Sequence, residues 1–319
     1  MATVHDQFVG VADEVTYATG VAPTAFFEVV SEDITGVYER IESEAIRGPL
    51  LREDRFAPNP KGAEGSFEFE VLDKGFEFWL SHMFGAVDDT TVPGSHVATL
   101  DSVSGKSFSL QAARYASGSD TLIPFSYHGG KVPEWELTAE VDGILKANLT
   151  LDFAAEVING SGVDALAVPA YPVGAQLLTF IGAEAVVDGI GFPVNSISLS
   201  GSNGLKVDRY AMRGGSSTAK REPKAEELQE ITFELAGEFE DDAHAQRVAA
   251  SLAAGATAAV TLSFDSPQGG TFEVALPVAR FDEAPANIAR AITEHTVTGK
   301  VLAPADGSEP ITATYVPVV

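Results

Sequence analysis

The sequence contains no cysteine among its 319 residues. This absence excludes disulfide bonds, thiolate metal sites and cysteine nucleophiles, and it suits assembly in a reducing cytoplasm. Long apolar runs are also missing, since none approaches the roughly 18 residues that a membrane-spanning helix needs. The N-terminal segment MATVHDQFVGVADEVT is acidic and lacks the basic start and apolar core of a signal peptide, so we expect no export by that route.

Basic residues are scarce. Lys and Arg number 20 against 46 Asp and Glu, which gives a net charge of −26. The excess is spread evenly, with 24 acidic and 10 basic residues in 1–150 and 22 and 10 in 151–319. An evenly acidic protein repels DNA and anionic membranes. We therefore expect no membrane binding, and a surface that either serves solubility or lets polyanions pass without sticking.

Motifs for catalysis or metal binding are few and weak. Gly105-Lys106-Ser107 is similar to the end of a phosphate-binding loop, but Leu100 stands where that motif needs glycine, and a strand rather than a helix is predicted after it. The six histidines show no metal-ligand spacing. Asp88-Asp89 and Asp241-Asp242 flank predicted helices, where solvation and capping explain them. We therefore expect no catalytic residue, no metal and no cofactor, and a protein that is not an enzyme.

The most informative stretch is GSFEFEVLDKGFEFWLSHMFG, residues 65–85. Phe67, Phe69 and Val71 alternate with polar residues, which predicts a half-buried strand. A short helix follows, with Asp73 as its predicted cap and Gly85 as its stop. Its apolar stripe is typical of a helix that lies across a sheet. The predicted helix-on-sheet core consists of Phe76, Trp79, Leu80, Met83 and Phe84.

The remaining chain looks like strands and loops. His128-Gly129-Gly130 is predicted as a turn between strands, and Asp142-Gly143 is a strong signal for a tight hairpin. Glu134, Glu136 and Glu140 share one face of the strand before that hairpin, and a solvated face explains them better than acid–base chemistry. Besides the strand in 65–85, the strands predicted up to this hairpin and beyond are 25–30, 34–41, 106–112, 121–127, 135–141 and 144–153.

A long exposed loop is predicted at 45–62, AIRGPLLREDRFAPNPKG. Its three prolines and two glycines are too many for a central strand. The loop is locally positive in an acidic chain, so we expect it to contact an acidic surface. Its basic residues are Arg47, Arg52, Arg55 and Lys61.

The second half of the sequence repeats the first in the same order. Residues 45–48 (AIRG) recur as 211–214 (AMRG), and 67–70 (FEFE) as 231–234 (ITFE). A helix over 243–254 follows, capped by Asp241 or Asp242 and ended by Gly255, and then strands at 260–264, 271–281 and 293–302. This order predicts a duplicated domain. We place the first copy at 1–160 and the second at 161–319, with the crossing in 154–174.

The order of elements and several longer segments together resemble one known family. The segment GSFEFEV is followed by a helix of the form F-x-x-W-L-x-x-M-F-G, and downstream come VNSISLSGSNGLKVDRYAMRG, KREPKAEELQEITFELAGEF, LPVARFDEAPANI and ITATYVPVV. These segments are similar to those of tail tube (major tail) proteins of long-tailed, siphovirus-type bacteriophages, especially phages of actinobacteria. The resemblance extends from about Phe26 to the end of the chain.

The resemblance implies a mainly β protein with a tandem pair of β-sandwich or barrel-like domains, each with one flanking helix. In that family, domains form six-fold rings around a channel, and the rings stack, partly through a long loop, into a tube that carries DNA to the host. It also implies a virion protein, assembled in the cytoplasm of the host bacterium. The implied partners are other copies of the chain, a tape measure protein, and tail terminator and tip proteins.

If each half is one tube domain, three chains make a pseudo-six-fold ring, and if only one half lines the channel, six are needed. We favour the trimer over the hexamer. Charged residues of the long loop in the first half and its counterpart in the second are the candidates for contacts between rings. These are Arg47, Arg52, Arg55, Arg213, Lys220 and Arg221.

Two other interpretations stay open. An acidic β-sandwich binding module of the adhesin type would need an exposed aromatic platform, whereas Trp79 and Trp135 occupy positions that favour the core. A tail-tip or baseplate protein with the same fold is the second. Self-assembly into hollow tubes or stacked rings would separate these from a tail tube protein.

Overall fold

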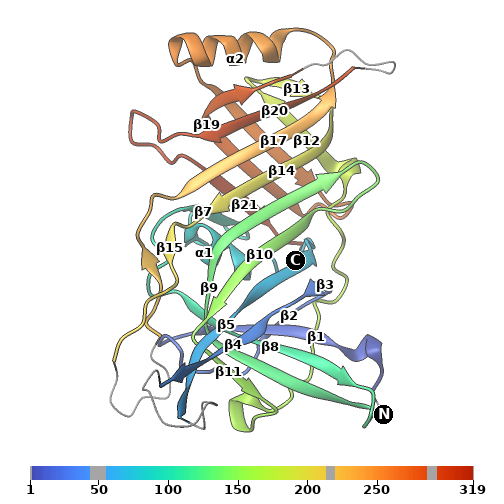
Figure 1. The fold of residues 1–319 in the computed structure, drawn as a ribbon. Coiled ribbons are helices and arrows are strands. Elements are labelled where there is room, and N and C mark those ends of the chain that lie inside the picture. Colours follow the sequence, from blue (N-terminus) through green and yellow to red (C-terminus); the bar gives the residue numbers. More distant parts are fainter. Residues whose placement is uncertain (1, 44–54, 213–219, 286–292, 319) are drawn as a thin grey trace.

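The computed structural model describes residues 2–43, 55–212, 220–285 and 293–318. Most of them lie in antiparallel strands, and this part of the chain contains two α-helices, α1 (Glu77–Met83) and α2 (Ala243–Ala254). The mainly β fold class expected from the sequence is confirmed. Figure 1 shows an elongated molecule in which the blue and green strands of the first half lie below the yellow to red strands of the second.

The first half contains the strands up to β11. In chain order they are β1 (Phe8–Glu14), β2 (Ala25–Phe27), β3 (Val29–Glu32), β4 (Thr35–Glu42), β5 (Phe56–Glu70), β6 (Gly85–Asp88), β7 (His96–Leu100), β8 (Ser107–Ala116), β9 (Thr121–Glu140), β10 (Lys146–Phe153) and β11 (Ala155–Ile158).

The second half contains the rest. In chain order they are β12 (Ala183–Val187), β13 (Ile190–Phe192), β14 (Val194–Ser202), β15 (Leu205–Lys206), β16 (Lys224–Ala225), β17 (Glu230–Glu238), β18 (Ala258–Asp265), β19 (Thr271–Glu283), β20 (Glu294–Val301) and β21 (Thr312–Val316).

One sheet runs through both halves, and we call it the shared sheet. Its strands lie in the order β5, β10, β9, β14, β17, β20 and β19, each antiparallel to the next. The strands β3 and β4 follow one another along the other side of β5. In Figure 1 these strands follow one another from the lower end of the molecule to its upper end.

Two side sheets each have one strand in common with the shared sheet. The first part of β9 leaves the shared sheet and lies between β8 and β11, in the order β2–β1–β8–β9–β11. The first part of β19 likewise lies between β18 and β21, in the order β13–β12–β18–β19–β21–β7–β6. In each half, one long strand therefore connects the shared sheet to a side sheet, β9 in the first half and β19 in the second.

The predicted turn at His128-Gly129-Gly130 is wrong, because β9 continues through it. Gly129 has a φ of +71°, and Gly130 lies so close to the rings of Phe108 and Phe153 that a side chain would clash. The two glycines bend the strand from one sheet into the other without reversing it. The hairpin at Asp142-Gly143 is present and connects β9 to β10.

The two halves pair their strands in the same order. The first half follows β2–β1–β8–β9–β10–β5–β3/β4, and the second follows β13–β12–β18–β19–β20–β17–β14. In each half, the helix is the next element in the chain after the strand that contains the matched segment, which is 67–70 in β5 and 231–234 in β17.

The halves meet at a joint built from two strand pairs. In the shared sheet, β14 pairs with the second part of β9, which places Leu199 opposite Leu137 and Gly201 opposite Trp135. In the second side sheet, β21 pairs with β7 of the first half. The sheets therefore continue from one half into the other.

Helix α1 fills the space between the sheets. All five predicted core residues are at most 1 % exposed: Phe76, Trp79, Leu80, Met83 and Phe84. The ring of Phe76 packs against Phe272 and Tyr315 of the second half, with centroids 5.3 and 5.8 Å away. The helix thus supports the joint as well as the core of the first half.

Asp73 does not cap α1 as expected, since the residue before the helix is Phe76. Instead its buried carboxylate accepts hydrogen bonds from the backbone N–H of Gln176 and the hydroxyl of Ser266, both at 2.7 Å. Asp73 therefore ties the start of α1 to the second half of the chain.

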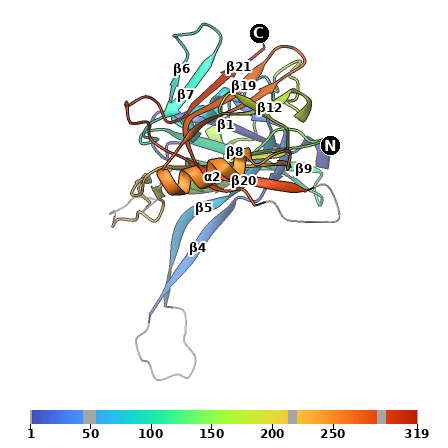
Figure 2. The ribbon, with the colours of Figure 1, turned by 90° about the horizontal axis from the view of Figure 1, so that it is seen from above.

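The predicted loop 45–62 is partly a strand, because β5 begins at Phe56. Among the described residues, this part of β5 pairs only with β4, with Pro58 opposite Arg40 and Pro60 opposite Tyr38. Proline is tolerated because no second described strand here needs its N–H. Figure 2 shows the β4–β5 ribbon projecting from the body of the molecule.

Helix α2 begins and ends at the residues predicted from the sequence. Its N-cap residue is Asp242, the carboxylate of Asp241 accepts a hydrogen bond from the N–H of Ala243 at 2.8 Å, and Gly255 ends it with a φ of +65°. Unlike α1, this helix lies on the outside of the molecule, at the top of Figure 1, and Leu252 is exposed.

Trp79→Ala should lower the free energy of unfolding of the unassembled chain by about 3–5 kcal/mol, because it empties a large volume in a close-packed core. Leu252→Ala on exposed α2 is the matched control and should change it by less than about 0.5 kcal/mol. Urea denaturation followed by circular dichroism measures both. Equal losses in the two variants would contradict the packing described for α1.

Gly201→Val should weaken the joint, because a Cβ at Gly201 would clash with the indole of Trp135. We expect a loss of about 1–3 kcal/mol from overpacking. Ser200→Val is the control, since it places the same side chain on the open face of the same strand. Differential scanning calorimetry of both variants measures the difference, and an unchanged melting temperature for Gly201→Val would contradict this geometry.

Candidate functional site on the shared sheet

The shared sheet has one apolar and one polar face. Along β9, Trp135 and Leu137 are buried in the core, whereas Glu134, Glu136 and Glu140 lie on the opposite face. Alternation of side chains along a strand produces this division. Strand β14 alternates in the same way and places only serines on the polar face, namely Ser196, Ser198, Ser200 and Ser202.

The polar side chains form rows across the strands. One row runs from Asn148 on β10 through Glu136 and Ser200 to Thr232 on β17, each directly opposite the next. Ser198 donates a hydrogen bond to Glu136 Oε1 at 2.8 Å. Because each row crosses the joint without a break, the face is one surface built by both halves.

This face is acidic. Over residues 66–70, 134–140, 146–150, 196–202, 230–238, 280–282 and 294–300 it carries ten carboxylates and three cations, so its net charge is 3 − 10 = −7. The carboxylates are Glu68, Glu70, Glu134, Glu136, Glu140, Glu230, Glu234, Glu238, Asp282 and Glu294, and the cations are Lys146, Arg280 and Lys300.

Each of these three cations is paired with a carboxylate of the same face. Lys146 Nζ lies 3.0 Å from Glu68 Oε1, and Lys300 Nζ lies 2.7 Å from Glu230 Oε1. The guanidinium of Arg280 contacts the carboxylate two residues further along β19 at 2.7 Å. The hydrogen bond to Glu68 raises the pKa of Lys146, so it stays charged at neutral pH. The paired cations are poorly placed to bind phosphate groups.

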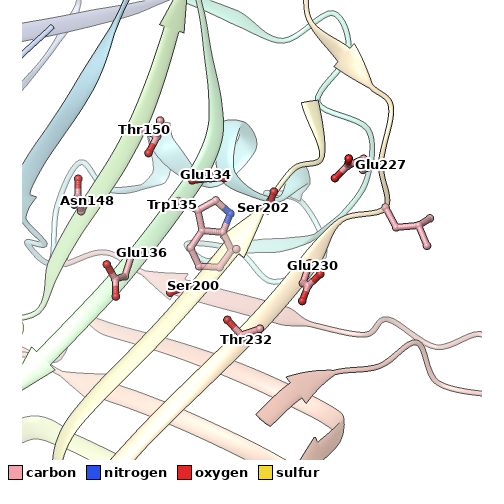
Figure 3. A pocket seen from close by; sticks show the side chains of 12 residues that line it. Glu134, Trp135, Glu136, Asn148, Thr150, Ser200, Ser202, Glu227, Glu230 and Thr232 are labelled. Atoms are coloured by element: carbon pink, nitrogen blue, oxygen red, sulfur yellow. The ribbon is translucent and has the colours of Figure 1, made fainter. Parts of the chain in front are cut away.

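A shallow cavity of about 340 Å³ lies on this face at the joint. Figure 3 shows the carboxylates of Glu134, Glu136 and Glu230 around it, with the indole of Trp135 between the strands. Trp135 is only 3 % exposed and Trp79 is fully buried. Neither tryptophan therefore forms the exposed aromatic platform that a carbohydrate-binding module would need.

One buried network has the composition of a catalytic triad. Ser109 Oγ lies 3.1 Å from His128 Nδ1, and His128 Nε2 lies 2.8 Å from Asp164. Ser109 is buried, and its hydroxyl also donates to Glu14 Oε1 at 2.8 Å. A nucleophile must reach its substrate, so this network stabilises the first side sheet.

The six candidate residues for ring contacts lie in different environments. Arg55 and Arg221 are exposed and belong to separate segments. Lys220 is buried, and its ammonium contacts Asp152 Oδ1 at 2.5 Å. Burial raises the pKa of Asp152 to about 6, although Lys220 lowers it. The ammonium of Lys220 is therefore paired with a carboxylate of the same chain. The other three lie outside the described residues: Arg47, Arg52 and Arg213.

Sequence patterns missed most of the polar face. The alternation NSISLSGS in 195–202 was available as a signal, and so were the glutamates of 230–238. The solvated face expected for Glu134, Glu136 and Glu140 agrees with their position here. Nothing local to these segments shows that β14 lies beside β9.

In the described part of the chain, neither helix is long and apolar enough to cross a membrane, and no cluster of three or more histidine or acidic residues is arranged to hold a metal ion.

A search of curated proteins gave no match for this chain. A family model described as phage tail tube protein matches residues 5–315. The chain therefore belongs to the phage tail tube protein family.

Proposed function

We propose that this protein polymerises as stacked rings into the hollow tail tube of a siphovirus-type phage, with the polar face of the shared sheet toward the channel. The observation that carries this proposal is the unbroken face itself, since one surface of small polar and acidic side chains spans both halves. A sheet that is apolar on one side and polar on the other suits a barrel around a water-filled channel.

The charge of this face supports passage of DNA through the channel. With a net charge of −7 and its three cations already paired, the face repels phosphates and offers them few binding partners. DNA ejection then proceeds without specific binding to the tube. Tape measure, terminator and tip proteins would be further partners, in a virion assembled in the host cytoplasm.

The common strand order of the two halves supports a duplicated tube domain, with copies at 1–160 and 161–319. Because both halves contribute strands to the shared sheet, three chains supply six similar units, and a pseudo-six-fold ring closes with three. This stoichiometry agrees with the preference for closed cyclic symmetry among homo-oligomers. A hexamer would instead place the two halves in different environments.

Purified protein should assemble into hollow tubes, visible by negative-stain electron microscopy. Glu134→Lys, Glu136→Lys and Glu230→Lys together should preserve the tubes but make them retain short duplex DNA in a form protected from nuclease. As control, Glu184→Lys, Asp265→Lys and Glu273→Lys make the same charge change at exposed residues of the second side sheet, where bound DNA would stay nuclease-sensitive.

Two results would contradict the proposal. Protein that remains a discrete particle under all conditions would exclude a tube and favour a tail-tip role. Equal nuclease protection by both triple variants would show that the polar face does not line the channel.

For stacking, we propose that basic residues at corresponding positions of the two halves contact the next ring. Reversing the charge of Arg47 and Arg213 together should leave single rings but block tubes, as seen by electron microscopy and size-exclusion chromatography. Lys74→Glu, a charge reversal away from these segments, is the control. Normal tubes from the double variant would refute the assignment.

A further inference from the structure

The connection between β14 and β17 belongs to the second half of the chain but lies against the first. Lys220 Nζ lies 2.5 Å from Asp152 Oδ1 on β10. Two residues later, Glu222 Oε1 lies 2.6 Å from Lys131 Nζ on β9. Asp152 and Lys131 are directly opposite each other in the shared sheet. Two ion pairs of opposite orientation therefore hold the connection on neighbouring strands, and Figure 1 shows it beside the strands of the first half.

The pair of Lys220 and Asp152 is buried on both sides. The two side chains are 5 % and 6 % exposed, whereas that of Glu222 in the other pair is 21 % exposed. The ammonium of Lys220 also donates a hydrogen bond to the carbonyl of Phe153 at 3.2 Å. Its stem lies beside Gly62, where a Cβ would stand 3.3 Å from Lys220 Cδ. The surroundings thus hold the amine in one place, away from solvent.

The two carboxyl groups differ in their hydrogen bonds. Burial raises the pKa of Glu222, but hydrogen bonds from Lys131 and from the N–H of Gly105 outweigh it, so that this pKa is lowered. Burial raises the pKa of Asp152 to about 6, although Lys220 lowers it. Among the described residues, Asp152 Oδ2 is buried and has no hydrogen-bond partner. Asp152 is therefore the carboxyl group that is readily protonated, and only a protonated carboxyl group is a good acceptor for an amine.

The geometry places the amine at reacting distance from the carboxyl carbon. A C–O bond is about 1.2 Å long, so the contact of 2.5 Å to Oδ1 keeps Lys220 Nζ within about 3.7 Å of Asp152 Cγ. Reacting atoms held about 3–3.5 Å apart gain a large effective concentration. Transfer of the shared proton from nitrogen to oxygen removes two buried charges at once, which a low-dielectric site favours.

We propose that Lys220 and Asp152 condense without an enzyme to form an isopeptide bond within the chain. The lone pair of the neutral Lys220 Nζ forms a bond to Asp152 Cγ. The bond from Cγ to the hydroxyl oxygen breaks, and this oxygen leaves as water with a proton from the nitrogen. One amine and one carboxylic acid thus give one amide and one water, with no oxidant or cofactor. The Lys131–Glu222 pair stays ionic.

The bond would be a covalent link between the halves of a chain that cannot form disulfides. A cross-link between residues far apart in the sequence stabilises a protein by constraining its unfolded state. An amide also resists the reducing conditions that break disulfides in a cytoplasm. The reaction takes place inside one folded chain, so it does not depend on the proposed assembly into tubes.

Intact-mass spectrometry of the denatured wild-type chain tests the bond. The mass should be lower than the sequence mass by one water, and digestion with trypsin should release a branched peptide in which Asp152 and Lys220 are joined. Lys220→Arg keeps the positive charge but has no primary amine, so it should restore the full mass. Lys224→Arg, the same substitution at an exposed residue of β16, is the matched control and should keep the loss of water.

Two results would overturn the proposal. The first is a wild-type chain that keeps its full mass after long incubation of the folded protein at neutral pH. The second is a loss of water that persists in Lys220→Arg, since a cyclic imide at an Asp-Gly pair such as Asp142-Gly143 also removes one water. The branched peptide from the wild-type chain separates the isopeptide bond from such an imide by itself, so the test does not depend on how well the variant folds.

Discussion

The pairing of β14 with β9 is the interaction on which the rest of the structure depends. It joins the sheets of the two halves, so that core residues such as Leu199 and Leu137 meet on one side and serines meet glutamates on the other. Gly201 allows the indole of Trp135 to lie against the strand. Helix α1 supports the same contact from behind, because Phe84 at its end packs against Trp135 with ring centroids 4.9 Å apart.

This joint explains how the two halves stabilise each other. A free strand edge must either be covered or find a partner, and here each half covers one edge of the other's part of the shared sheet. On two separate sheets, the carboxylates and serines of the polar face would be ordinary solvated residues. Because the shared sheet is continuous, they lie together on one acidic surface.

The sequence predicted local features well. The alternation around Phe67, the hairpin at Asp142-Gly143 and the end of α2 at Gly255 all depend on neighbouring residues, and all three are present. It predicted a turn at Gly129-Gly130 and a loop through Pro58 because glycine and proline usually end strands. Here the glycines bend a long strand, and the prolines lie in a two-stranded ribbon that needs no further hydrogen bonds. The pairing of β14 with β9 and the buried position of Lys220 depend on residues far apart in the chain, which local patterns do not encode.

A cryo-electron microscopy reconstruction of the assembled tube tests the central claim most directly. The account predicts a channel wall made of the shared sheet, with Glu136 and Ser200 facing inward and three chains in each ring. A tube whose wall places these residues on the outside, or whose channel is lined by the side sheets, would contradict it.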